Sequence, residues 1–181
     1  ETWKLILTET KKLNIKIYCD VFGITAFRLA KKFNLDGIKI HSSDLNNYHL
    51  LNECKKYNKK IFLSAGGSTL DEIEYALSFF DGKKQRPILL HGFQSYPTSV
   101  EDSSLSRINL FKKLFNKRCE FGYQDHISGS NKFSDILPVL SMYYNINYIE
   151  KHITLNRKQK GVDYYSSIEP KKLKSFINMI R

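Results

Sequence analysis

Short apolar runs alternate along this chain with stretches in which apolar residues recur every three or four positions. The short runs are typical of buried strands, and the longer stretches are typical of amphipathic helices. Strands are predicted at 14–19, 37–41, 60–64, 87–92, 119–124 and 147–153. Helices are predicted at 2–13, 24–34, 46–58, 69–80, 101–116, 135–145 and 170–180. Strand and helix therefore alternate with a period of roughly 25 to 30 residues, which predicts a parallel sheet with helical crossovers.

Capping residues mark where several of these helices begin. Thr69 followed by Glu72 forms a capping box, and Thr98 followed by Glu101 has the same spacing. Pro170 suits the first turn of the last helix, where a missing N–H costs nothing. These signals support the helix starts that the apolar pattern predicts.

The alternation predicts an α/β fold of the (β/α)8 TIM-barrel type, of which this chain holds about six βα units. Eight units need about 250 residues, whereas this chain has 181. We expect a single, partial barrel domain over residues 1–181 that lacks the first two units, with an open sheet as the alternative. No GxGxxG motif follows the first strand, so a dinucleotide-binding fold is the weaker choice.

Each predicted strand ends in a polar or ionisable side chain. These strand ends hold Asp20, Lys39 to Ser42, Ser64, His91, Asp125 with His126, and His152. In a (β/α) barrel the carboxyl ends of the strands meet at one face, and the loops there build the active site. The pattern therefore predicts one site assembled from several strand ends.

Two histidines, His126 and His152, end consecutive strands. Two imidazoles on neighbouring strands can bind one divalent ion such as Mn²⁺, Mg²⁺, Fe²⁺ or Zn²⁺. Asp125 and Glu150 are candidates for orienting the rings from behind. The alternative is that each histidine caps its strand and forms a hydrogen bond to a loop.

Lys39 lies inside an apolar strand, where an ammonium group is costly unless it is paired. We therefore expect it to face an anion, the alternative being an edge lysine that reaches solvent. The turn Ser64-Ala65-Gly66-Gly67-Ser68-Thr69 leads into a helix, and its backbone N–H groups could bind an oxyanion. A plain tight turn explains that segment equally well.

Composition and charge narrow the class of protein. The chain is 41% hydrophobic, enough for a substantial core, and no apolar run approaches the roughly 18 residues that span a bilayer. The net charge of +11 comes from scattered lysine pairs that fall on predicted helix faces, so no nucleic acid is expected as a partner. Cys19, Cys54 and Cys119 are widely spaced and form no CxxC pair, which favours small buried side chains in a reduced, cytoplasmic setting.

Five stretches, taken in order, resemble the sialic acid synthase family, which comprises N-acetylneuraminate synthase and related nonulosonic acid synthases. They are IKIHSSDLNNYHLL (38–51), KKIFLSAGGSTLDEIEYAL (59–77), LLHGFQSYPT (89–98), GYQDHISG (122–129) and EKHITLNRKQKGVDYYSSIEP (150–170). The resemblance covers the chain from residue 15 onward. It implies the barrel domain of that family, without its first two strands and without its C-terminal antifreeze-like domain.

The resemblance also implies an activity and a cofactor. Members of the family are transferases of carbohydrate biosynthesis that condense phosphoenolpyruvate with an N-acetylated amino sugar such as N-acetylmannosamine. The product is a sialic or related nonulosonic acid, and phosphate is released. A divalent metal, Mn²⁺ or Mg²⁺, acts as a Lewis acid on the sugar aldehyde. In the family the C-terminal domain reaches a partner's active site, and a homodimer is among the assemblies that the resemblance implies.

The resemblance assigns roles to matching residues. The metal ligands are His126 and His152, and the catalytic residues are His126, His152 and Asp44. The phosphoenolpyruvate ligands are Lys39, Ser42, Ser64 and Gln124. The acceptor-sugar contacts are Gln94, Tyr96 and Asp163. The chain departs from the family in having Asp44 for a glutamate, Gln94 for an asparagine, Gln124 for a serine and Asp20 for a threonine near the phosphate.

The sequence is also compatible with three other hypotheses. One is an aldolase that forms a Schiff base through Lys39 or Lys151. Another is a degenerate barrel that has lost catalysis and acts as a binding protein. The last is nucleic-acid binding through the net positive charge, which predicts a steep dependence of affinity on salt.

Overall fold

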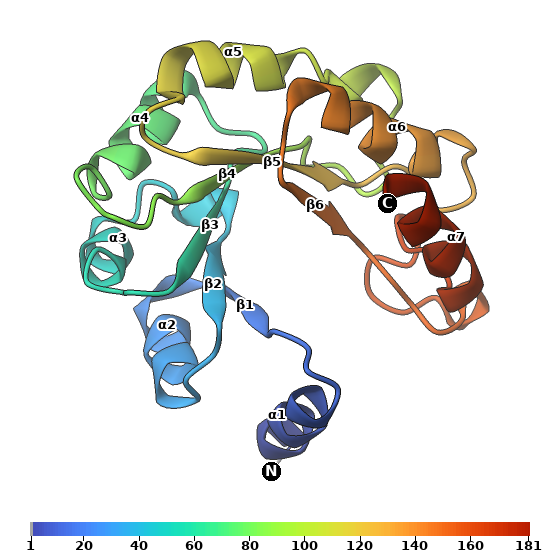
Figure 1. The fold of residues 1–181 in the computed structure, drawn as a ribbon, viewed down its shortest axis with the longest axis horizontal. Coiled ribbons are helices and arrows are strands. Elements are labelled where there is room, and N and C mark those ends of the chain that lie inside the picture. The colour runs from blue at the N-terminus through green and yellow to red at the C-terminus, as the bar shows by residue number, and fades with distance from the viewer. Residues whose placement is uncertain (1) are drawn as a thin grey trace. The chain divides into compact units, whose positions relative to one another are not determined.

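The computed structural model describes residues 2–181 and shows strands and helices in alternation (Figure 1). The strands are β1 (Tyr18–Val21), β2 (Gly37–Ile40), β3 (Lys60–Ser64), β4 (Ile88–His91), β5 (Glu120–Asp125) and β6 (Tyr148–Lys151). The α-helices are α1 (Thr2–Lys12), α2 (Gly23–Lys32), α3 (Tyr48–Cys54), α4 (Leu70–Ser78), α5 (Arg107–Phe115), α6 (Phe133–Ser141) and α7 (Pro170–Ile180). Short 3-10 helices lie at Ser42–Asp44, Glu101–Ser103, Met142–Tyr144 and Arg157–Gln159. The predicted alternation is confirmed.

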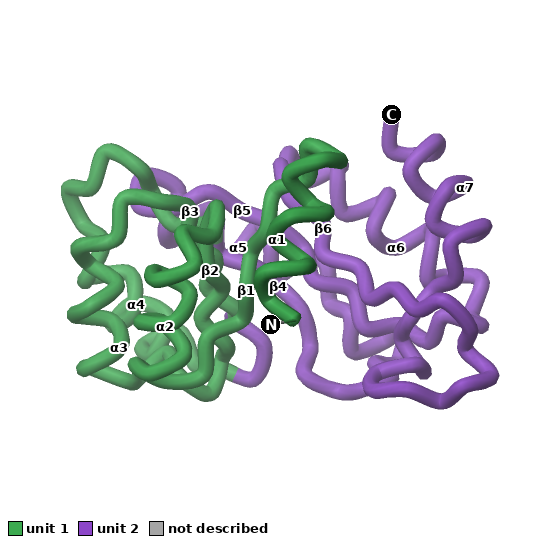
Figure 2. The backbone as a smooth tube through the Cα atoms, turned by 90° about the horizontal axis from the view of Figure 1, so that it is seen from below, with its two compact units in different colours: residues 1–64, 68–88 green, residues 65–67, 89–181 purple. Residues whose placement is uncertain are grey.

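Two compact units make up the chain (Figure 2). The first comprises residues 1–64 and 68–88, and the second comprises residues 65–67 and 89–181. The expected synthase domain over residues 1–181 stays a prediction, and its first residue, Glu1, lies outside the described residues.

In the first unit, β1, β2 and β3 pair in parallel and in chain order. The register places Asp20 of β1 opposite Lys39 of β2. Helix α2 packs on β1 and on α3. Apolar side chains from these strands and helices form the core, because burying them removes apolar surface from water. Its fully buried members include Phe27, Ile38, Ile40, Leu50, Leu51, Leu63, Ile73 and Leu77.

In the second unit, β4, β5 and β6 follow chain order, and β5 pairs with β6 in parallel. Helix α6 packs on β5, and α7 packs on α6. His91, at the end of β4, is a core residue here: its Nε2 lies 2.9 Å from the carbonyl oxygen of Ser103, and its ring meets the edge of Phe111. Burial lowers the pKa of His91, which keeps the ring neutral.

Local signals placed several helix starts correctly. The backbone N–H of Glu72 donates to Oγ1 of Thr69 at 3.2 Å, and the N–H of Thr69 donates to Oε2 of Glu72 at 2.8 Å. This reciprocal pair confirms the predicted capping box of α4. Pro170 is the first residue of α7, as predicted.

The predicted helix at 101–116 is wrong in its first part. Ser104 has a left-handed backbone (φ 39°) that separates a 3-10 turn from α5. Thr98 does not form the predicted box with Glu101, because its hydroxyl donates to the carbonyls of Phe93 and Ser95. Ser99 takes that place, since its Oγ accepts the N–H of Asp102 at 3.1 Å.

The first strand also begins later than the predicted 14–19. Asn14 adopts a left-handed conformation (φ 54°) after α1, and the N–H of Ile17 donates to the carboxylate of Asp36 at 2.8 Å. An N–H engaged by a side chain cannot join a strand ladder. Strand β1 therefore begins only at Tyr18.

The cysteines behave as the composition predicts. All three are free thiols, and Cys54 and Cys119 are buried, while Cys19 is partly buried. Burial raises the pKa of the Cys54 thiol to about 12, which keeps that thiol protonated and unreactive. Among residues 2–181, no helix has both the length and the apolar character that crossing a bilayer requires.

Candidate metal centre

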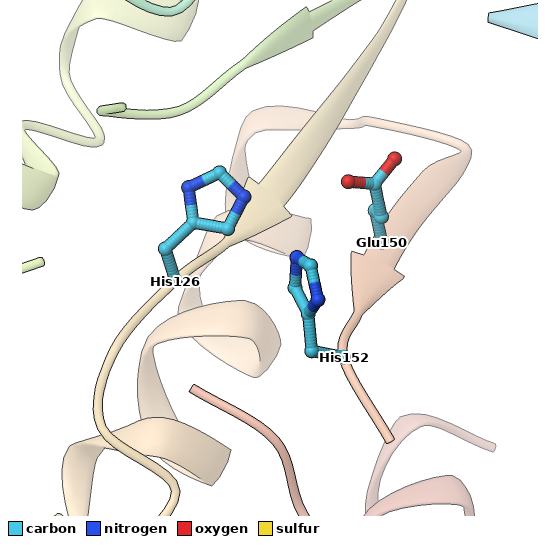
Figure 3. A group of neighbouring side chains, drawn as sticks. All are labelled: His126, Glu150 and His152. Atoms are coloured by element: carbon cyan, nitrogen blue, oxygen red, sulfur yellow. The ribbon is translucent and has the colours of Figure 1, made fainter. Parts of the chain in front are cut away.

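Three side chains that can ligate a metal converge at the ends of β5 and β6. They are His126, Glu150 and His152, and their candidate donor atoms all lie within 4.8 Å of one another. Figure 3 shows the three side chains directed toward a common space, His126 from the end of β5 and the other two from β6 and its end. The two imidazole centroids are 5.3 Å apart. The prediction that these rings meet at adjoining strand ends is confirmed.

His126 is held in place by contacts to both its ring and its backbone. Nδ1 lies 2.8 Å from the carbonyl oxygen of Phe93. A carbonyl can only accept, so Nδ1 carries the proton and the lone pair of a neutral ring is on Nε2. The backbone carbonyl of His126 accepts from the N–H of Thr98 at 2.9 Å and from the hydroxyl of Ser166 at 2.7 Å. The side chain is therefore pre-set to present Nε2 as a ligand.

His152 is more open than His126, with a quarter of its side chain exposed. The carboxylate of Asp163 lies 3.7 Å from Nδ1 of His152. This separation is too long for a hydrogen bond, but it places a carboxylate beside the ring. Asp163 itself has a left-handed backbone (φ 55°). The sequence predicts Asp163 as a sugar contact, and no local pattern indicates its place beside the histidine.

Glu150 lies beside the two histidines, among the atoms that could bind a metal. Residues 150 and 152 are two positions apart on an extended segment, so their side chains point to the same side of the sheet. The Glu-x-His spacing could have shown this from the sequence. Glu150, which we expect to orient a ring, thus also lies among the candidate donor atoms.

The donor set fits a divalent transition metal. Two imidazole nitrogens and one carboxylate oxygen suit Mn²⁺, Fe²⁺ or Zn²⁺, and they leave coordination positions for a substrate. The chemistry of the three side chains thus supports a metal site.

Tyr96 lies over both histidines. Its ring centroid is 4.3 Å from that of His126 and 5.7 Å from that of His152. Its hydroxyl donates to Oε1 of Gln94 at 2.9 Å. Gly66 makes room for this pair, because a Cβ at that position would lie 2.6 Å from Cγ of Gln94. Tyr96 and Asp163 thus contact the histidines and Gln94 contacts Tyr96, and the role of these three residues as sugar contacts stays a prediction.

Gln124 and Asp125 occupy opposite sides of β5. Gln124 is buried and lies opposite Glu150 in the strand register. Asp125 does not stand behind a histidine ring as expected; instead its carboxylate forms a buried ion pair with Lys151. Burial raises the pKa of Asp125 and lowers the pKa of Lys151, while the attraction between the opposite charges acts against both shifts.

The other residues assigned to phosphoenolpyruvate lie in the first unit. Lys39 faces an anion, as predicted, and that anion is Asp20, whose Oδ2 is 3.3 Å from Nζ. Ser42 begins a 3-10 turn and Ser64 is fully buried at the end of β3. The carboxylate of Asp44, assigned a catalytic role, accepts from the N–H of Gly23 at 3.0 Å and from Asn47 at 2.8 Å.

Several backbone N–H groups of the Gly-rich turn already donate hydrogen bonds within the protein and are not available to bind an oxyanion. The N–H of Ala65 donates to the carbonyl of Leu90 at 2.9 Å. The N–H groups of Thr69 and Glu72 are engaged in the capping box of α4. Gly67 has a positive φ of 72°, which explains a glycine there as a requirement of the turn. Of the two readings of this segment, the tight turn is the one that these contacts favour.

This chain is similar to several known proteins. The sequence model of the NeuB family matches residues 1–181. The N,N'-diacetyllegionaminic acid synthase of Campylobacter jejuni is 32% identical over 98% of this chain and 52% of its own length. The crystal structure of an N-acetylneuraminic acid synthetase from Leptospira borgpetersenii in complex with citrate superposes with a TM-score of 0.87 at 32% identity, covering 97% of this chain and 59% of that chain.

A truncated 3-deoxy-D-arabino-heptulosonate 7-phosphate synthase from Thermotoga maritima shares the fold, with a TM-score of 0.80 over 97% of this chain and 68% of that chain at 15% identity. The chain spans about half the length of the curated relatives that it matches. The fold is thus an α/β fold like that of these synthases. This chain belongs to the NeuB family.

Proposed function

We propose that this chain supplies part of a metal-dependent nonulosonic acid synthase, which condenses phosphoenolpyruvate with an N-acetylated amino sugar and releases phosphate. The observation that carries the proposal is the convergence of His126, Glu150 and His152 at the ends of β5 and β6. A relative named as a legionaminic acid synthase and a solved sialic acid synthetase support the same class of reaction. A divalent metal held there would polarise the carbonyl of the open-chain sugar.

The residues of this chain divide into two groups by the substrate they would bind. Lys39, with the hydroxyls of Ser42 and Ser64, would hold the carboxylate and phosphate of phosphoenolpyruvate by charge-assisted hydrogen bonds. Gln94, Tyr96 and Asp163 would orient the amino sugar beside the metal donors. Carbon 3 of phosphoenolpyruvate then forms a bond to the sugar carbonyl carbon, water adds at carbon 2, and the bond from carbon 2 to the phosphate oxygen breaks.

We further propose that the intact protein forms a (β/α)8 barrel, to which this chain contributes six strands. The support is the likeness to a longer synthetase chain, of which this chain covers 59%. In a barrel the carboxyl ends of all strands face one side.

The structure gives no support to a Schiff-base aldolase that uses Lys151. An amine nucleophile must be neutral and accessible to a carbonyl. The side chain of Lys151 is only 5% exposed, and its ammonium group pairs with Asp125 and donates to the carbonyl of Ser134. Reacting with a carbonyl would require breaking this buried pair.

Metal removal tests the proposed function directly. The intact protein is stripped with a chelator, and phosphate release from phosphoenolpyruvate is measured with N-acetylmannosamine or a related N-acetylated amino sugar. We expect release to require both the sugar and added Mn²⁺ or Mg²⁺. Phosphate release that survives complete metal removal would rule out the metal centre, and a metal-loaded protein that releases no phosphate with any such sugar would rule out the synthase.

A Tyr96→Phe substitution separates sugar binding from metal binding. The change removes the hydroxyl that donates to Gln94 but keeps the ring over the two histidines. Losing one neutral hydrogen bond costs about 1 kcal/mol, so we expect KM for the amino sugar to rise about fivefold at 1.4 kcal/mol per tenfold. Mn²⁺ affinity and KM for phosphoenolpyruvate should not change. Equal rises in both KM values would contradict a role confined to the sugar.

A further inference from the structure

A buried ion pair joins the two strands that lead to the candidate metal donors. It lies on the face of these strands that points away from the donors. Asp125 of β5 and Lys151 of β6 are direct partners in the parallel register. Their side chains are 0% and 5% exposed, respectively. Side chains alternate along a strand, so these two point away from the side on which Gln124 and Glu150 lie. The pair therefore lies behind the candidate metal donors, and neither of its side chains is one of them.

Each member of the pair is tied to further groups. The ammonium of Lys151 also donates to the backbone carbonyl of Ser134, the second residue of α6, at 2.7 Å. The carboxylate of Asp125 accepts from the hydroxyl of Tyr123 at 3.3 Å and from the backbone N–H of Ile127. These contacts join the ends of β5 and β6 to each other and to the start of α6.

The covalent neighbours of this pair are the metal donors themselves. Asp125 immediately precedes His126, and its bond to the N–H of Ile127 spans the histidine. Lys151 stands between Glu150 and His152. Any shift of one strand end along the other would therefore change the distances between the three donor atoms. A buried charge pair opposes such a shift strongly, because separating the charges in a low-dielectric interior leaves each one without compensation.

We propose that Asp125 and Lys151 are positioning residues, which fix the relative placement of His126, Glu150 and His152 and so set the affinity for the metal. This inference rests on the proposed metal-dependent function. It differs from the hypothesis that Lys151 forms a Schiff base. Here the ammonium holds the ends of β5 and β6 in place and contacts no substrate. It also explains why a carboxylate and an ammonium are buried next to a site whose ligands are other residues.

The test measures Mn²⁺ binding by isothermal titration calorimetry on the full chain, with no substrate present. In Lys151→Met we expect Mn²⁺ affinity to fall about 10- to 100-fold, the usual effect of losing a group that supports metal ligands. Lys172→Met is the matched control. Lys172 donates to the hydroxyl of the same Ser134 and pairs with Asp135 at 3.3 Å, but it lies on α7 rather than on a strand that carries a donor. Its Mn²⁺ affinity should equal that of the wild type.

If Lys151→Met does not fold, a second variant tests the same inference. Asp125→Leu/Lys151→Met replaces the pair by apolar side chains, a change that buried ion pairs often tolerate without loss of stability. Circular dichroism establishes that each variant is folded at the temperature of the titration. We expect the folded double variant to lose about as much Mn²⁺ affinity as Lys151→Met, since both remove the same ion pair and the effects of contacting residues are not additive.

The outcomes separate this inference from the proposed function. Wild-type affinity for Mn²⁺ in a folded Lys151→Met or in the folded double variant overturns the positioning role and leaves the metal-dependent function intact. A wild-type protein that does not bind Mn²⁺ overturns both. The inference is also overturned if Lys172→Met weakens Mn²⁺ binding as much as Lys151→Met does. Such a result would mean that any disturbed packing around α6 lowers the affinity.

Discussion

Replacing His126 with alanine is expected to abolish metal-dependent phosphate release. The substitution removes the most buried of the three donors, and Lewis-acid stabilisation of a carbonyl is worth several kcal/mol. At about 1.4 kcal/mol per tenfold, turnover should fall on the order of 10²- to 10³-fold or more. Phosphate release and Mn²⁺ binding are the measurements, each made on protein shown to be folded.

The fold should survive this substitution. The backbone carbonyl of His126, which accepts from Thr98 and Ser166, is unchanged, and the lost ring contact to the Phe93 carbonyl costs about 1 kcal/mol of stability. His49→Ala is the control, because His49 is exposed on α3 and takes no part in the site. Normal turnover in His126→Ala would end the assignment of His126 as a metal ligand.

Replacing Lys39 with methionine is expected to raise KM for phosphoenolpyruvate about 10- to 100-fold, since a charge-assisted hydrogen bond is worth about 1.5–3 kcal/mol. The methionine side chain keeps most of the buried apolar stem of lysine while removing its charge. KM for the amino sugar and affinity for Mn²⁺ should be unchanged. Steady-state kinetics with each substrate varied in turn measures the separation.

Asp20→Asn should change KM for phosphoenolpyruvate in the opposite direction. Asp20 pairs with Lys39 at 3.3 Å and adds a negative charge near the proposed phosphate site. Its side chain is 38% exposed, so the effect is screened and a pair of this kind contributes about 0–1 kcal/mol. A decrease in KM of a few-fold at most is expected. The control for Lys39→Met is Lys32→Met, which also removes one positive charge but at an exposed position of α2. A rise in KM for Asp20→Asn as large as that for Lys39→Met would show that Asp20 positions the lysine rather than competing for it.

Local sequence patterns predicted the elements well where a single segment contains the whole signal. The capping box of α4 needs only Thr69 and Glu72, which are three residues apart. The late start of β1 and the left-handed Ser104 could not be read in this way. Ile17 is diverted from the ladder by Asp36, a residue 19 positions away, and no pattern in 14–19 contains that partner.

The candidate site was predictable to a similar degree. The sequence by itself determined that His126 and His152 end neighbouring parallel strands, because apolar runs and their polar ends are contiguous features. Only the tertiary structure decided which groups these residues meet: Glu150 joins the donors, Asp20 faces Lys39, and Asp125 turns away to pair with Lys151. The physical reason is strand register, since a shift by one residue exchanges the two faces of a strand. Register depends on packing and hydrogen bonds between distant segments, so it exists only once the chain has folded.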